Sequence, residues 1–139
     1  MYLIGFPLLV IPFAIYNMIA FLMPSLSWTD HIFSVHLVSG QEWTVTTEDI
    51  LLVFSVLLLS VEVMKSTRIG IRSMIDHILS MVLFIVMLVE FLLVKQAGTS
   101  TFFILMIISL VDVMTGFVVS IRSAQRDIAI DSADRLTPN

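Results

Sequence analysis

Carboxylates inside apolar stretches are the residues of this sequence best suited to chemistry. Asp112 stands in the middle of the apolar run 101–121, and Glu90 and Glu62 stand inside two other apolar runs. An ionisable side chain at the centre of a bilayer costs about 2.5–3.5 kcal/mol on insertion scales, so such residues mark proton or ion pathways by default. A neutral carboxyl group can instead donate a hydrogen bond between helices. Both hypotheses stay open for Asp112, and we favour helix packing.

Small residues follow Asp112 at a spacing of four, in the order Gly116, Ser120 and Ala124. Residues four apart lie on one face of an α-helix. Small side chains on such a face let a second helix approach closely and gain van der Waals contacts. The pattern predicts a helix-packing stripe headed by Asp112, and the partner helix belongs to the same chain, to another copy or to a different protein.

Tyr16 and Asn17 form a second polar group, expected at about the depth of Glu90. The depth follows from counting at ~1.5 Å per residue along two helices that cross a membrane in the same direction. Polar groups in lipid rarely stay unpaired, so we favour a satisfied network with an Asn17–Glu90 hydrogen bond. A polar vestibule leading toward Asp112 is the alternative.

A third polar group is expected where the second and third apolar runs meet. Glu62 and His77 approach this turn from opposite sides, and Arg68, Arg72 and Asp76 lie near it in the sequence. We favour a salt-bridge cluster that fixes the turn, with the basic side chains reaching the lipid headgroups. The alternative is a proton-entry site, because a histidine beside a carboxylate is a common proton shuttle.

Metal, catalytic and nucleic-acid motifs are missing from the sequence. The chain has no cysteine, which excludes disulfides and thiolate metal sites. His31 and His36, with Asp30 and Glu42, match no established metal-site spacing. There is no phosphate-binding loop, zinc-protease motif, nucleophile motif or basic patch. The sequence therefore predicts no enzyme, no cofactor, no metal and no nucleic-acid partner, and it predicts bound membrane lipid.

The composition is that of a membrane protein. Of the 139 residues, 58% are hydrophobic and 13% are charged, against roughly 45–50% and about 25% in soluble domains. Four apolar runs are each close to the roughly 20 residues that a helix needs to cross a bilayer: 2–23, 48–68, 74–94 and 101–121. The expected fold is an all-α, polytopic membrane protein of two antiparallel hairpins, with a transmembrane domain over 1–126 and a short tail over 127–139.

Charged and aromatic residues predict how the chain lies in the membrane. Basic residues cluster after the second and fourth runs, whereas residues 24–49 contain no Lys or Arg. By the positive-inside rule both termini are cytoplasmic. The expected interface anchors, which are basic on the inner side and aromatic on the outer side, are Lys65, Arg68, Arg72, Arg122, Trp28 and Trp43.

Two segments depart from simple helices. The loop 24–47 contains "IFSVHLVSGQEWTVT", in which apolar residues alternate on both sides of Ser39-Gly40. This alternation predicts a short β-hairpin, with an irregular interfacial loop as the alternative. Pro7 and Pro12 fall inside the first run and predict a kinked or distorted first helix.

Three stretches, "FPLLVIPFAIYNMI", "VEFLLVKQAGTSTFF" and "SLVDVMTGFVVSIRSAQRDI", give the chain a family likeness. It resembles a group of small bacterial inner-membrane proteins with four predicted spans. The resemblance implies a bacterial plasma membrane and no activity. We expect a non-enzymatic subunit or scaffold that packs into a homo-oligomer or a larger membrane complex. The alternative is a small oligomeric ion or proton channel, or a proton-coupled transporter, that uses the intramembrane acids.

Overall fold

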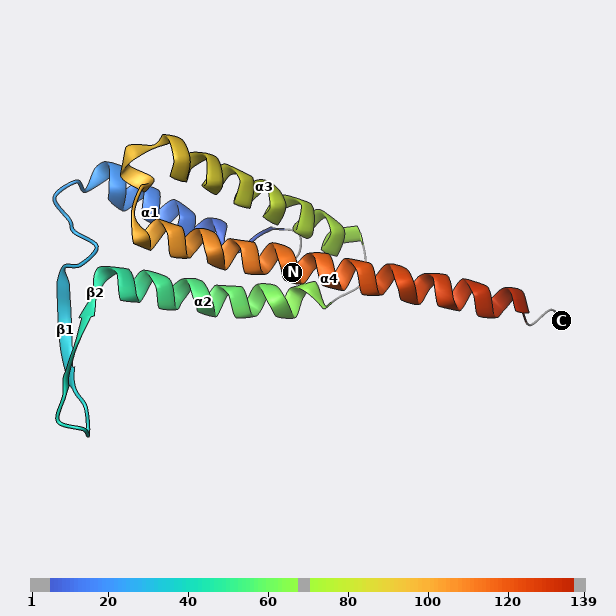
Figure 1. The fold of residues 1–139 in the computed structure, drawn as a ribbon, viewed down its shortest axis with the longest axis horizontal. Helices are drawn as coiled ribbons and strands as arrows, with labels where there is room; N and C mark the ends of the chain where they lie inside the picture. The colour runs from blue at the N-terminus through green and yellow to red at the C-terminus, as the bar shows by residue number, and fades with distance from the viewer. Residues whose placement is uncertain (1–5, 68–70, 137–139) are drawn as a thin grey trace.

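The computed structural model describes residues 6–67 and 71–136 of the chain, and this part is mostly helical. Figure 1 shows its helices lying side by side, with a β-hairpin at one end and a long helical extension at the other. The elements in chain order are α1 (Val10–Leu22), β1 (His31–His36), β2 (Glu42–Thr46), α2 (Thr47–Ser66), α3 (Ile71–Leu93), the 3₁₀ turn η1 (Lys95–Ala97) and α4 (Ser100–Leu136).

The centre of the bundle is α4, which packs against both α2 and α3, while the shorter α1 lies alongside (Figure 1). The buried core gathers around Phe102 of α4, whose ring meets the rings of Phe13, Tyr16 and Phe91 at centroid distances of 6.3, 4.9 and 6.3 Å. Aromatic pairs at such distances are stabilising beyond the area that they bury. The first half of α4 is therefore the element around which the others assemble.

Two of the helices are long and apolar enough to cross a membrane, among the residues that the structure describes. They are Met74–Leu93 in α3 and the apolar part of α4, with window hydropathies of 2.2 and 2.5. The 20 residues of α2 carry Glu48 and Asp49 in the first turn and Glu62 and Lys65 near the end. With only 13 residues, α1 is shorter than the roughly 20 that a helix needs to span hydrocarbon.

The structure corrects the predicted position of Pro7, which lies before the first helix and not inside it. The helix begins at Val10, so Pro7 precedes it and Pro12 lies in its first turn. The first N–H groups of a helix have no partner within it, so a proline there removes no helical hydrogen bond. Neither proline therefore breaks a hydrogen bond in the interior of α1.

The predicted β-hairpin is confirmed, so the fold is not purely α-helical. β1 and β2 pair antiparallel, with Val35 opposite Trp43 and Ser34 opposite Thr44. Gly40 has a φ of 88° in the connecting turn, a conformation that glycine adopts without strain. The strand leads directly into α2 through a capping box, in which Thr46 and Asp49 exchange hydrogen bonds.

The fourth helix continues beyond the predicted span of 101–121 through most of the predicted tail, because α4 ends at Leu136. At ~1.5 Å per residue its 37 residues extend about 55 Å. Figure 1 shows the second part projecting beyond the bundle, and the side chains described there are exposed. We call 121–136 the α4 extension.

Candidate functional site

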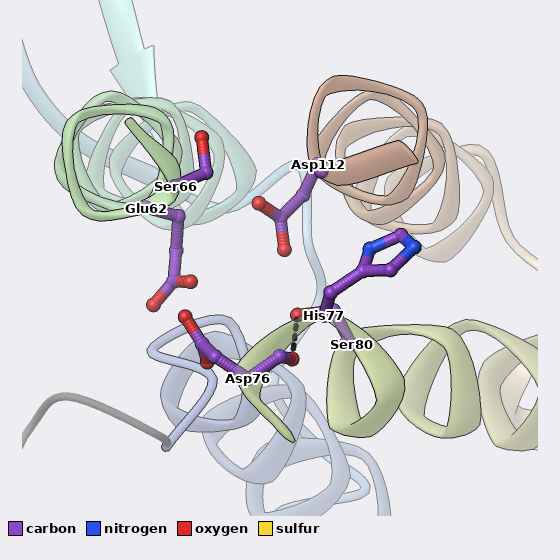
Figure 2. A pocket seen from close by; sticks show the side chains of 7 residues that line it. Glu62, Ser66, Asp76, His77, Ser80 and Asp112 are labelled. Carbon is purple, nitrogen blue, oxygen red and sulfur yellow. Dashed lines mark hydrogen bonds between the residues drawn. The ribbon is translucent and has the colours of Figure 1, made fainter. Parts of the chain in front are cut away.

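A small polar cavity lies near one end of the bundle, between α2, α3 and α4, and we call this end the cavity end. Its volume of about 10 Å³ is close to the smallest that can hold one water molecule. Figure 2 shows polar side chains of three helices converging on it. The lining residues are Glu62, Ser66, Asp76, His77, Ser80, Asp112 and Gly116.

The lining follows a repeated pattern. On each of the three helices an acid is followed four residues later by a small residue: Glu62 with Ser66, Asp76 with Ser80, and Asp112 with Gly116. Since residues four apart share a helix face, each helix turns one acid and one small residue toward the same space. Sequence analysis missed Ser66 and Ser80, although counting four residues on from the acids inside the apolar runs finds them.

Glu62 is the most deeply buried of these acids, with 1% of its surface exposed. Its Oε1 accepts a hydrogen bond of 2.6 Å from the backbone N–H of Leu8 and one of 3.1 Å from Nζ of Lys65. Lys65 also donates to the carbonyl oxygen of Phe6 at 2.8 Å. Glu62 and Lys65 thus attach the segment before α1 to the end of α2.

Asp76 provides a second carboxylate for Lys65, whose Nζ lies 3.5 Å from its Oδ2. The other oxygen, Oδ1, is buried without a hydrogen-bond partner among the described residues, and so is Nδ1 of His77. The backbone carbonyl of Asp76 accepts from the Ser80 hydroxyl at 3.0 Å (Figure 2). The cavity therefore retains unused polar atoms after its internal bonds have formed.

Asp112 and Gly116 form the α4 wall of the cavity, and both are buried. A Cβ atom added to Gly116 would overlap with the imidazole ring of His77. This half of the predicted packing stripe therefore contacts α3 of the same chain. Ser120 and Ala124 are exposed, so the stripe divides into a half that lines the cavity and a half without a partner in the described chain.

The charges of the cavity do not balance. Glu62 and Asp76 contact the ammonium group of Lys65, and Asp112 adds a third carboxylate to the same lining. Buried charges that lack a counter-charge are strongly unfavourable, and one ammonium group compensates only one of the three carboxylates. No three His, Asp or Glu side chains in 6–67 and 71–136 are placed to hold a metal ion.

The second polar group lies at the opposite end, which we call the hairpin end. The Tyr16 hydroxyl donates to the carbonyl oxygen of Gln96 at 2.8 Å and lies 2.7 Å from Oγ1 of Thr99. The ring of Tyr16 stacks on Trp28 with a centroid distance of 4.6 Å. These bonds join α1 to the turn between α3 and α4.

The predicted contact between Asn17 and Glu90 is confirmed, with Nδ2 of Asn17 at 3.5 Å from Oε2 of Glu90. Buried apolar residues separate this pair from the cavity along α3, since Met87 and Leu83 lie between Glu90 and Ser80. A vestibule running from Glu90 to Asp112 would have to pass this apolar layer.

The expected interface anchors have different surroundings. Lys65 is held in the cavity cluster with 12% of its side chain exposed, whereas Arg122 is exposed on α4. Trp43 is half exposed on β2. Arg68 and the side chain of Arg72 lie outside the described residues.

The histidines of the loop make local contacts. Nε2 of His31 lies 2.8 Å from the Ser34 hydroxyl, and His36 is paired in register with Glu42.

No family model matches the chain, and searches among curated proteins and solved structures found no similar protein. Function is therefore inferred from the cavity and from the exposed surfaces of the molecule.

Proposed function

We propose that the protein is an integral protein of a bacterial inner membrane that acts as a non-enzymatic subunit or scaffold. In this proposal four segments cross the bilayer, both termini are cytoplasmic, and the molecule packs through helix contacts into a homo-oligomer or a larger membrane complex. Membrane lipids surround the bundle and include bound lipid.

The N-terminal segment is long enough to be a crossing although α1 has only 13 residues. At the cavity end the Phe6 carbonyl accepts from Lys65, and at the hairpin end the Trp28 carbonyl accepts from the N–H of Glu48. Along α2 the distance from Glu48 to Lys65 is about 26 Å at ~1.5 Å per residue. Residues 6–28 thus follow α2 over most of the ~30 Å of a hydrocarbon layer.

The charges of α2 are compatible with a crossing. Glu48 and Asp49 lie in its first turn, where they belong to the headgroup region, and Glu62 and Lys65 pair with each other. Lys65, Arg122 and Arg126 all belong to the cavity end or to the helix beyond it. This distribution supports a cytoplasmic cavity end by the positive-inside rule.

The observation that carries the scaffold proposal is the uncovered α4 extension. Phe117, Ile121, Ala124 and Ile128 follow one another at spacings of four, three and four, and all are exposed. This spacing is that of a helix–helix seam, and it continues past the residues that lipid could cover. A second helix from another copy or from a larger complex would cover these exposed apolar side chains and so stabilise the extension.

Native mass spectrometry of the protein, extracted gently from its own membrane, tests the scaffold proposal. We expect an assembly that Ile128→Lys dissociates and that the matched variant Ile130→Lys leaves intact. Residues two apart lie on nearly opposite helix faces, and both isoleucines are exposed. A monomer in the wild-type sample would contradict the proposal. Gly116→Leu is not a suitable probe, because it would disturb the packing against His77.

The second candidate function is a proton-coupled channel or transporter, favoured by one observation, the excess of carboxylates around a cavity with unpartnered polar atoms. If Asp112 exchanges protons, Asp112→Asn should abolish proton flux in liposomes while the protein remains folded and assembled. If Asp112 only packs, the variant should leave every measured property nearly unchanged, since asparagine has almost the same shape. Absence of flux in wild-type liposomes would reject this candidate.

A further inference from the structure

The β1–β2 hairpin separates its side chains by polarity. Side chains of directly paired residues and of residues two apart share a sheet face. Phe33, Val35, Trp43 and Val45 therefore lie on one face, whereas Ser34, His36, Glu42 and Thr44 lie on the other. One face of the hairpin is entirely apolar and the other entirely polar.

The apolar face is uncovered over most of its length. Phe33, Val35 and Trp43 are 48%, 37% and 50% exposed, whereas Val45 at the base of the hairpin is 5% exposed. A two-stranded hairpin is at best marginally stable in water by itself. An apolar surface that covered these three side chains would therefore stabilise the hairpin.

The position of the hairpin indicates where that surface lies. Figure 1 shows the strands running across the direction of the helices, at the end where α2 begins. If the helices cross a bilayer, the hairpin extends along the membrane surface. Because Val45 is buried next to the start of α2, its face is turned toward the bundle and, farther out, toward the lipid beside α2.

An apolar groove connects the hairpin to the lipid-facing surface of the helices. Its volume is about 170 Å³, and it lies between α1, β1 and α2. Ile32, the additional residue at the irregularity in β1, lines it together with Ile19, Ile50 and Phe54. The apolar surface therefore continues from the base of the hairpin down the sides of two helices.

We propose that the hairpin lies flat in the headgroup layer and inserts Phe33, Val35 and Trp43 among the chains of phospholipids in the leaflet at the hairpin end. The inference rests on the proposed membrane bundle. Residues 24–49 contain no Lys or Arg, so the contact is apolar and does not select anionic lipids. Aromatic side chains such as Trp43 favour this layer because one part of the ring system is apolar and another is polar.

The natural absence of cysteine allows a direct test with single spin labels. Val35→Cys and Ser34→Cys place nitroxides on neighbouring residues of opposite faces. Each full-length variant is reconstituted in phosphatidylcholine vesicles, with most vesicles holding one protein. We expect oxygen, which concentrates in lipid, to relax the label at 35 more than a water-soluble nickel chelate does. The order should be reversed at 34.

Two outcomes would overturn the inference about the hairpin, and a third would overturn the membrane bundle on which it rests. Equal exposure of both labels to the nickel chelate means that the hairpin stands in water. Shielding of residue 35 from both reagents, with spin–spin broadening that fades on dilution, means that a second copy covers the face. A label at Val86, an exposed position in the middle of α3, separates the two proposals: nickel access there would reject the membrane bundle itself.

Discussion

At the hairpin end Tyr16 attaches α1 to the bundle through neutral groups, whereas at the cavity end Glu62 and Lys65 attach the preceding segment through charges. Tyr16 is fully buried, its hydroxyl has two partners within 2.8 Å, and its ring stacks on Trp28. Glu62 and Lys65 also bind one another, yet the neighbouring carboxylate of Asp76 keeps an unpartnered oxygen.

The difference lies in hydrogen bonding: the hydroxyl group of Tyr16 is fully paired, whereas buried polar atoms at the cavity end lack partners in the described part of the chain. The aromatic contact is satisfied by its own members, so nothing further has to bind there for stability. Around the cavity, Glu62 and Asp76 share the ammonium group of Lys65, and Asp112 adds a third carboxyl group to the lining. Incompletely satisfied buried networks are costly and persist where they have a use. The two ends therefore differ in how fully their buried polar groups are paired.

Removal of the Lys65 ammonium group is expected to have the largest effect. Lys65→Met keeps much of the side-chain volume but leaves Glu62 and Asp76 without their common counter-charge. Removing one partner of a buried ion pair destabilises proteins by about 3–5 kcal/mol. We expect the free energy of unfolding to fall by this amount. It is measured by SDS unfolding in mixed micelles, followed by circular dichroism.

Arg135→Met is the matched control for this charge removal, because Arg135 pairs with Asp131 at 3.1 Å on the exposed surface of the α4 extension. Exposed pairs contribute little to stability, so this variant should unfold like the wild type. Similar small changes in both variants would show that water reaches the cavity cluster freely. The hairpin end and the cavity end would then differ in the types of residue that they contain but not in stability.

Gly116→Ala should have the next largest effect, and its sign is diagnostic. Within a helix this change normally stabilises by about 1 kcal/mol, because alanine has the higher helix propensity. Here the new Cβ overlaps with the ring of His77, and overpacking of this kind costs about 1–3 kcal/mol. The same SDS unfolding measurement should therefore show a net destabilisation.

A second substitution identifies the cause of that loss. When His77 has already been replaced by alanine, Gly116→Ala should raise the free energy of unfolding, as the higher helix propensity of alanine predicts. Ser120→Ala, one turn farther along α4 and exposed, should change stability only slightly in either background. A stabilising effect of Gly116→Ala alone would mean that His77 can move away without cost.

Local sequence patterns predicted the elements with long apolar runs or clear alternation. Apolar length predicted helices near 48–68, 74–94 and 101–121, and alternation around Ser39-Gly40 predicted the hairpin. The Asn17–Glu90 contact was predicted from depth alone. Because the two helices run in the same direction, counting residues along each one gives the depth of its side chains.

Contacts that depend on where helices pack could not be predicted in this way. Glu62 binds the N–H of Leu8, 54 residues earlier in the chain, and a backbone donor carries no signal in the sequence. Lys65 was expected at the headgroups, yet it turns inward because two carboxylates converge on it. The small size of Gly116 was evident, but its neighbour His77 depends on the packing of α3 against α4.

Tyr16→Phe should have the smallest of these effects, although the tyrosine is fully buried. The substitution removes only the hydroxyl and keeps the ring on Trp28 and against Phe102. Its partners are not stranded, because the N–H of Phe102 still donates to Thr99 and Gln96 is exposed to solvent. A neutral hydrogen bond contributes about 1 kcal/mol under these conditions, so we expect a loss of that order in SDS unfolding. A loss as large as that of Lys65→Met would show that the hairpin end, with its neutral contacts, determines stability as much as the charged end does.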